Sequence, residues 1–141
     1  MPLGHLTFGT LDEDLTPGEL AARAKLKFDG IMYLLGCIQV LFNEHQLLNA
    51  TQQLKRLRTA VEDLYVFLGG SAGKASAIRR QHRVFVPTTK DKAVKLAITA
   101  GQTVASISKP LADGDINLAL MQMERSLELL GQLILSVGAM R

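Results

Sequence analysis

Apolar residues recur every three or four positions through most of the chain, which is the spacing of amphipathic helices rather than of strands. Thr16, Pro17 and Glu19 are typical of a helix start, because threonine caps, proline tolerates the first turn and glutamate completes a capping box. We therefore expect a first helix from residue 17 to about residue 42. Its main apolar stripe consists of Phe28, Ile31, Met32, Leu35, Ile38 and Phe42. Further apolar residues lie off this stripe, so the second half of the helix needs burial on more than one side.

A second helix is expected at residues 46–68, after the polar break at residues 43–45 and before the stop signal Gly69-Gly70. Residues 70–87 are rich in glycine and serine and then in basic residues. This composition predicts an irregular segment with room for a short helical turn near 75–83. The run at 84–86 is β-like but too short to form a sheet.

A third helix is expected at residues 90–108, capped by Thr88 or Thr89 and stopped by Pro110. It carries small residues four positions apart, at Ala97, Gly101 and Ala105. Such a stripe would let two helix backbones approach each other closely.

The fourth helix is expected to begin at residues 113–115 and to extend to about residue 139. Its apolar positions alternate in strict four-three spacing over three heptads. They are Ile116, Leu120, Met123, Leu127, Leu130, Ile134 and Val137. We predict an all-α fold, a four-helix bundle built from two helical hairpins joined by a basic loop. Residues 1–15 are expected to form a mobile arm and residues 16–141 a single domain.

Composition narrows the class of protein. The chain has 141 residues and a mean hydropathy of +0.17, with 48% apolar and 21% charged residues, which favours one folded domain over disorder. The N-terminus has no signal-peptide pattern, and both of the longest apolar runs are shorter than the ~20 residues of a membrane span. One cysteine forms no internal disulfide. We therefore expect a cytoplasmic protein with no membrane span.

Candidate chemistry is sparse. The glycine-rich run at 69–76 lacks the first glycine and the hydroxyl residue after lysine that a phosphate-binding loop requires. His5, His45 and His82 have no carboxylate on a shared helix face, and the Glu-x-x-His pattern of di-iron bundles is absent. Cys37 has no neighbouring base. We predict no catalytic residues, no metal site and no cofactor.

The basic residues are unevenly distributed. The net charge is +3, yet residues 70–95 alone sum to +6. The candidate basic-loop residues are Lys74, Arg79, Arg80, Arg83, Lys90 and Lys92. Such a loop could bind nucleic-acid phosphates or an acidic protein surface, or it could be a solvated linker. Nucleic-acid binding is the less favoured of the functional interpretations, because no nucleic-acid-binding motif accompanies these charges.

The first and fourth helices carry more apolar residues than a bundle position requires. Either both helices are central in the bundle, or part of this surplus binds a partner. The candidate partner-binding residues are Ile31, Leu34, Leu35, Ile38, Leu118, Met121, Leu129 and Leu133. The partner would be an apolar helix of another protein, or further copies of this chain in a virion or filament.

The first hairpin resembles a known family. The opening Thr16-Pro17-Gly18-Glu19-Leu20 and the segment Phe28-Asp29-Gly30-Ile31-Met32-Tyr33-Leu34 are similar to the start of the FliS-type flagellar export chaperones. The similarity continues without gaps from Gly30 through the turn at residues 44–46 and Ala50 to Leu68. It implies a cytoplasmic helical bundle without catalytic activity, which holds the disordered C-terminal end of flagellin in apolar grooves before export.

Overall fold

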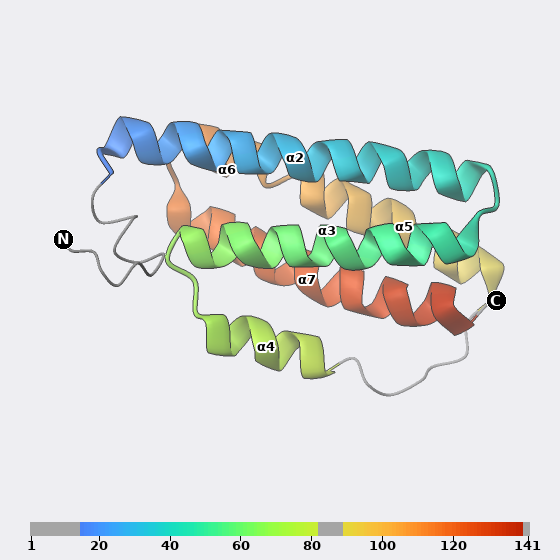
Figure 1. Cartoon of the computed structure of the whole chain (residues 1–141). Helices are drawn as coiled ribbons and strands as arrows, with labels where there is room; N and C mark the ends of the chain where they lie inside the picture. Colours follow the sequence, from blue (N-terminus) through green and yellow to red (C-terminus); the bar gives the residue numbers. More distant parts are fainter. Residues whose placement is uncertain (1–14, 82–88, 140–141) are drawn as a thin grey trace.

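The computed structural model describes residues 15–81 and 89–139, and within these ranges it contains helices and turns but no strand. The helices are α2 (Pro17–Asn43), α3 (Leu47–Phe67), α4 (Ala72–Gln81), α5 (Lys90–Ala105), α6 (Ser108–Asp113) and α7 (Ile116–Ala139). Figure 1 shows α2, α3, α5 and α7 lying roughly along one direction, with α4 beside them. The predicted all-α class is confirmed. Residues 1–14 of the predicted arm and the β-like run at 84–86 lie outside the described residues.

Helix ends follow the predicted signals. The Thr16 hydroxyl accepts the Glu19 backbone N–H and the Glu19 carboxylate accepts the Thr16 backbone N–H, both at 3.1 Å. This capping box holds the pKa of Glu19 below its usual value, chiefly because the Thr16 backbone donates to the carboxylate. Thr89 caps α5 by accepting the Lys92 N–H at 3.3 Å. The capping predictions at both helices are confirmed.

The end of α3 depends on two glycines in different ways. Gly69 has a φ of +101°, a backbone conformation that glycine adopts without strain. The Gly70 N–H donates to the Tyr65 carbonyl at 2.8 Å, which completes a Schellman-type end. A Cβ at Gly70 would lie 2.5 Å from the Tyr65 ring. Gly70 is therefore required by close packing, because its missing side chain leaves space for the tyrosine.

The core is centred on α3 and α7. Helix α3 packs between α2 and α7, and α7 also packs against α5, α4 and α6. The four-three spacing predicted for α7 is confirmed by burial over its C-terminal two-thirds. Its buried members are Met123, Leu127, Leu130, Ile134 and Val137. They meet the fully buried α3 residues Leu57, Val61 and Leu64, so the α3–α7 contact is the interior of the molecule.

The irregular segment predicted at 70–87 instead begins with the ten-residue helix α4. Ser71 starts it by accepting the Lys74 N–H at 3.1 Å, and Ala75 and Ile78 bury its inner face. The short helical turn expected near 75–83 is present but begins at Ala72 and spans ten residues. The rest of the expectation was wrong, because the buried contacts of Ala75 and Ile78 stabilise a helix where composition alone favours a loop.

The third helix was predicted to end at Pro110, and this prediction was wrong. Helix α5 already ends at Ala105, and Pro110 lies in the first turn of α6, where a backbone N–H has no helical partner to lose. Gly114 then ends α6 with a φ of +76°, and Asp115 caps α7 by accepting the Leu118 N–H at 3.1 Å.

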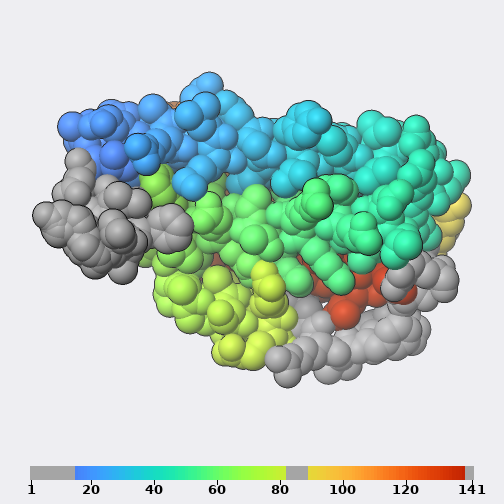
Figure 2. Space-filling model, viewed as in Figure 1, coloured from blue at the N-terminus to red at the C-terminus, as the bar shows by residue number. Residues whose placement is uncertain are grey.

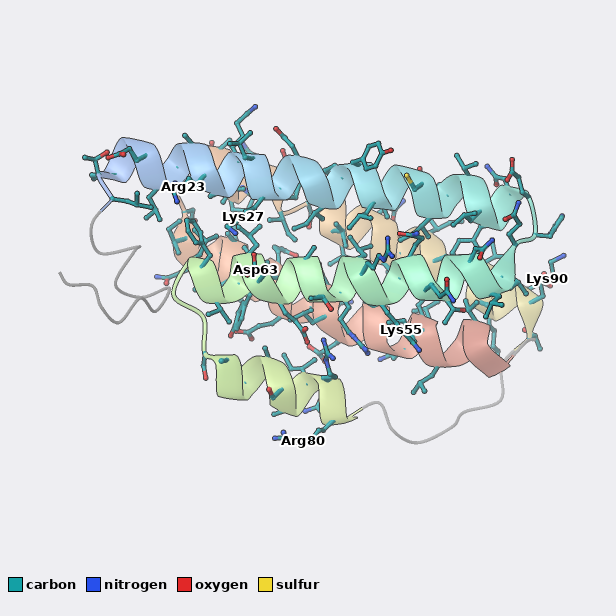
Figure 3. The ribbon with its side chains drawn as sticks, in the orientation of Figure 1. Arg23, Lys27, Lys55, Asp63, Arg80 and Lys90 are labelled. Atoms are coloured by element: carbon teal, nitrogen blue, oxygen red, sulfur yellow. The ribbon has the colours of Figure 1, made fainter. Side chains whose placement is uncertain are left out.

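Side chains close the seam between α2 and α3. The Lys27 ammonium lies 2.9 Å from the Asp63 carboxylate and 5.0 Å from the centre of the Phe67 ring. Figure 3 shows Lys27 and Asp63 pointing toward each other from the two helices. In the space-filling view, α2 and α3 accordingly form one continuous surface (Figure 2).

Candidate functional site

The seam between α2 and α5 is the loosely packed part of the molecule. Helix α2 contacts α3 along its length but touches α5 at only a few positions. A hollow of about 670 Å³ opens between the C-terminal half of α2 and the N-terminal half of α5. A second hollow of about 370 Å³ continues it toward Met32 and Ala105, and both are lined by Gln39, Ala97 and Ile98. We call this continuous depression the α2–α5 groove.

The wall that α5 contributes is apolar and exposed. Val94 and Ile98 lie one helical turn apart on this wall, and they remain 49% and 55% exposed. On the opposite wall are Phe42 and Gln39 of α2. Apolar side chains left half in water at the rim of a concave surface are the usual lining of a site that binds another apolar group.

The floor of the groove is the core itself. A small cavity of about 40 Å³ below it is lined by residues of α2, α3, α5 and α7. Gly101 lies at this depth, and a Cβ added there would meet Leu35 at 3.7 Å, an ordinary contact distance. The prediction that the small residues of α5 bring two helix backbones close together was therefore wrong. These small residues instead leave the groove deep.

The groove is lined by basic but not by acidic side chains among the described residues. Lys90 and His45 lie at one end. His45 is held in a left-handed turn conformation, with a φ of 59°, between α2 and α3. The remaining polar lining groups are the amides of Gln39, Asn43 and Gln102. The groove therefore presents an apolar trough with a cationic end.

Burial corrects half of the predicted partner-binding residues. Ile31, Leu35, Ile38 and Leu133 are at most 9% exposed and belong to the core. The three α2 residues are buried because the main α2 stripe packs against α3 rather than facing solvent, and Leu133 is buried in the core from α7. The last three of these line the small cavity below the groove.

Leu35 also lines the second hollow of the groove, whereas the other four predicted residues line neither hollow. Leu34 and Leu129 are partly buried against the core. Leu118 and Met121, on the N-terminal half of α7, are exposed but lie apart from the groove. Val94 and Ile98 were not among the predicted residues, because surplus apolar residues were expected on the first and fourth helices alone. The available signal was an apolar pair at i and i+4 beside the small residues of α5.

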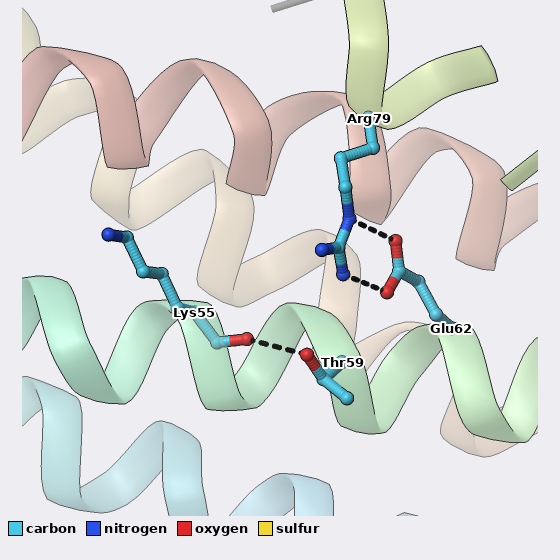
Figure 4. Close-up of polar contacts among 4 residues, drawn as sticks. All are labelled: Lys55, Thr59, Glu62 and Arg79. Carbon is cyan, nitrogen blue, oxygen red and sulfur yellow. Dashed lines mark hydrogen bonds and ion pairs between the residues drawn. The ribbon is translucent and has the colours of Figure 1, made fainter. Parts of the chain in front are cut away.

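The predicted basic residues do not gather in one patch. The Lys74 ammonium lies 2.9 Å from Glu124, and the Arg79 guanidinium makes two contacts with Glu62, one of them 3.0 Å from Nε (Figure 4). Arg80 on α4 and Lys90 on α5 lie in widely separated parts of Figure 3. Lys92 is exposed on the first turn of α5, and Arg83 lies outside the described residues.

A second arginine lies beside the Arg79–Glu62 pair. The Arg58 Nε is buried and has no hydrogen-bond partner among the described residues. Burial lowers the pKa of Arg58, the charge of Arg79 lowers it further, and the Glu62 carboxylate opposes both effects. Glu62 thus serves two guanidinium groups, and this cluster holds α4 to α3.

No group of three His, Cys, Asp or Glu side chains in the part of the chain that the structure describes could hold a metal ion. The cysteine, Cys37, is partly exposed on α2. Helix α2 is the one described helix whose length and hydropathy would allow it to cross a membrane. The core helix of a soluble protein can have the same composition.

The fold and the groove therefore define an all-helical protein with an open apolar seam. Comparison of the chain with protein-family models, with curated proteins and with solved structures finds no match.

Proposed function

We propose that this protein is a non-enzymatic chaperone or adaptor that holds an apolar helical segment of a partner protein in the α2–α5 groove. The observation that carries the proposal is the half-exposed pair Val94 and Ile98, which lines a hollow of about 670 Å³. An amphipathic helix laid into an apolar groove buries this kind of surface.

The proposal rests on an architecture in which α2, α3, α7 and α5 form a four-helix bundle, with α4 as an additional helix on its side. The packing order α2–α3–α7–α5 supports this assignment, because each long helix packs along the next. The α2–α5 edge would then be the one edge that the bundle leaves unclosed. A helix from a partner would cover it and complete the layer.

The groove also specifies the chemistry of the partner. Its apolar walls suit leucine, isoleucine or valine side chains one helical turn apart. Lys90 at one end suits a carboxylate, either of an acidic side chain or of a chain terminus. The resemblance of the first hairpin to the FliS-type chaperones makes the C-terminal segment of flagellin the partner we propose, held in the cytoplasm before export.

The direct test uses a fluorescein-labelled peptide with the sequence of a flagellin C-terminal segment, titrated with the full chain and followed by fluorescence anisotropy. Replacement of Ile98 by Asp places a charge on the apolar wall and should weaken binding at least tenfold, since a desolvated carboxylate costs more than 1.4 kcal/mol. Leu118→Asp is the matched control, because Leu118 is also an exposed apolar residue but lies outside the groove. It should bind as the unmodified protein does.

Equal weakening by both substitutions, or none by either, would contradict binding in the groove. Failure of the flagellin peptide to bind would remove flagellin as the partner. A helical peptide with leucines on one face and glutamates on the other then tests the groove itself. If this peptide binds the Ile98 variant as tightly as it binds the Leu118 control, the groove is not the binding site.

We do not propose nucleic-acid binding. Two of the six predicted basic-loop residues, Lys74 and Arg79, are paired with carboxylates. Arg80 and Lys90 are too far apart to act as one phosphate-binding surface (Figure 3). A nucleic-acid footprint requires several cations on a single face.

A further inference from the structure

The outward face of α2 carries an apolar stripe that the α2–α5 groove does not use. Leu26, Tyr33 and Val40 are 70%, 74% and 53% exposed. They follow one another at seven-residue intervals, close to two turns of helix, so they lie along one line. The buried residues Phe28 and Ile31 point to the opposite side, toward α3. In Figure 1 α2 lies along the upper edge of the molecule, with no other helix above it.

Two glycines lie beside this stripe, and no contact inside the molecule requires a residue without a side chain at either position. A glycine in the middle of a helix costs roughly 0.5–1 kcal/mol relative to alanine. A Cβ added to Gly30 or to Gly36 would meet no atom within 4 Å. Packing within the chain therefore does not require either glycine. Gly36 also lines the second hollow of the α2–α5 groove, whereas Gly30 lines neither hollow. A body that approaches the outward face of α2 closely would require Gly30.

The positions of these residues are symmetrical about Tyr33. Gly30 and Gly36 lie three residues before and after it, and Leu26 and Val40 lie seven residues before and after it. We propose that this face binds the same face of a second copy of the chain, with the two α2 helices antiparallel and a two-fold axis passing at Tyr33. Leu26 then faces Val40, Gly30 faces Gly36, and Tyr33 faces its own copy.

The antiparallel pairing also matches the sizes of the side chains that face each other. A two-fold contact is self-complementary, because each residue before the axis meets the residue equally far behind it. Large side chains meet large ones, and the glycines leave space beside the axis for the two tyrosine rings to stack with an offset.

Charge selects the antiparallel orientation. Arg23 lies ten residues before Tyr33 and Glu44 eleven residues after it, so the antiparallel pair brings opposite charges together near both ends. A parallel pair would bring arginine to arginine and glutamate to glutamate. The exposed Asp29 carboxylate lies beside Gly30 on the same face, and a charge at that position opposes burial in lipid. A second copy therefore fits this face better than a bilayer does.

The dimer goes beyond the proposed chaperone function and is tested by different variants. The full chain is measured by sedimentation velocity at about 50 µM, a concentration at which a micromolar dimer is well populated. The unmodified protein should sediment as a dimer and Tyr33→Glu as a monomer. Leu48→Glu is the matched control, because Leu48 is 53% exposed but lies off the stripe, and it should remain dimeric. Circular dichroism checks that both variants are folded.

Cross-linking tests the orientation. In a Cys37→Ser background, Leu26→Cys mixed with Val40→Cys should form a disulfide-linked heterodimer, whereas Leu26→Cys alone should not cross-link. Gly30→Ala, which lies outside the groove, should weaken the dimer at least tenfold while the fold is retained. A monomer at all concentrations, a dimer that Tyr33→Glu leaves intact, or cross-linking of Leu26→Cys to itself would overturn the proposal. So would flotation of the unmodified chain with phosphatidylcholine vesicles that Tyr33→Glu abolishes, since lipid would then cover this face.

Discussion

Two helix–helix contacts that are both lined by apolar residues differ in how completely they exclude water. Where α3 meets α7, Leu57, Val61, Met123 and Leu130 are at most 1% exposed. Where α2 meets α5, Val94 and Ile98 stay half in water beside a hollow of about 670 Å³. The difference shows that apolar spacing alone does not tell a packed seam from an open one. The volume of the side chains that face each other decides.

The α5 helix explains this difference. Its buried positions are Ala93, Ala100 and Val104, which are small residues, whereas α7 fills the same kind of position with leucine, isoleucine and methionine. Small side chains on α5 cannot reach α2, so the seam stays open. The α3–α7 contact is therefore expected to contribute most to stability, and the open α2–α5 groove is the site at which we propose binding.

The largest effect is expected from a cavity at the closed contact. Leu130→Ala should lower the free energy of unfolding by about 2–5 kcal/mol, because the surrounding helices cannot collapse around the missing methyl groups. Ile98→Ala at the open seam should change it by less than about 0.5 kcal/mol. Urea denaturation of both variants measures the contrast. Similar losses for the two would show that the groove is as much a part of the stabilising core as the α3–α7 contact.

A smaller loss is expected from overpacking beside the closed contact. In Gly70→Ala the new methyl group would lie 2.5 Å from the Tyr65 ring, so the ring must shift, at a cost of roughly 1–3 kcal/mol. Gly73→Ala is the matched control, because its nearest neighbour would be Ser71 Oγ at 3.6 Å. Thermal unfolding of the two variants should separate them, and equal melting temperatures would contradict the close approach.

The pH dependence of stability should report the Tyr65 hydroxyl, which donates to Glu124 at 2.9 Å between α3 and α7. Burial, with a further contribution from Glu124, raises the pKa of Tyr65 from 10.0 to about 12. Its contribution to stability is fully present below pH 10. Between pH 10 and pH 12 the unfolded chain loses this proton while the folded chain keeps it, so stability falls.

The loss over this interval should reach at most about 2.7 kcal/mol, the free energy of a two-unit pKa shift. Urea denaturation at pH 9, 10 and 11 measures it, with Tyr65→Phe as the control that keeps the ring and every lysine. The difference in stability between the two proteins should shrink as the pH rises. A constant difference would show that the hydroxyl titrates alike in both states.

The smallest of these effects is expected at the start of α2, away from both helix contacts compared above. Thr16→Ala removes the side-chain acceptor of the capping box and should cost about 1 kcal/mol. Thr59→Ala, on the exposed face of α3, removes only a bond to the Lys55 carbonyl inside a helix and should be close to neutral (Figure 4). Urea denaturation compares them, and a larger loss at Thr59 would contradict the capping role.

The sequence allowed the parts of the fold that depend on local chemistry to be predicted. The capping box at Thr16, the cap at Thr89 and the stop at Gly69 each follow from two or three neighbouring residues, and the heptads of α7 repeat often enough to show which face is buried. The length of helix α4, of which only a short turn was expected, and the place of Pro110 escaped prediction because they depend on contacts with distant helices.

The groove could not be predicted for a related reason. Whether Val94 and Ile98 are covered depends on how far α2 lies from α5, and that distance is set by residues on both helices. The sequence analysis recognised that apolar surface exceeded what the interior requires, but it placed much of the excess on Ile31, Leu35 and Ile38, which are buried. The exposed apolar side chains are instead on α5 and on the outward face of α2.

The most direct test of the central claim is a methyl nuclear magnetic resonance titration of the isoleucine- and valine-labelled full chain with the flagellin C-terminal peptide. The account predicts that the methyl signals of Val94 and Ile98 shift on binding, while those of Ile78, buried under α4, stay in place. Binding of the peptide with no shift at Val94 or Ile98 would contradict the assignment of function to the α2–α5 groove.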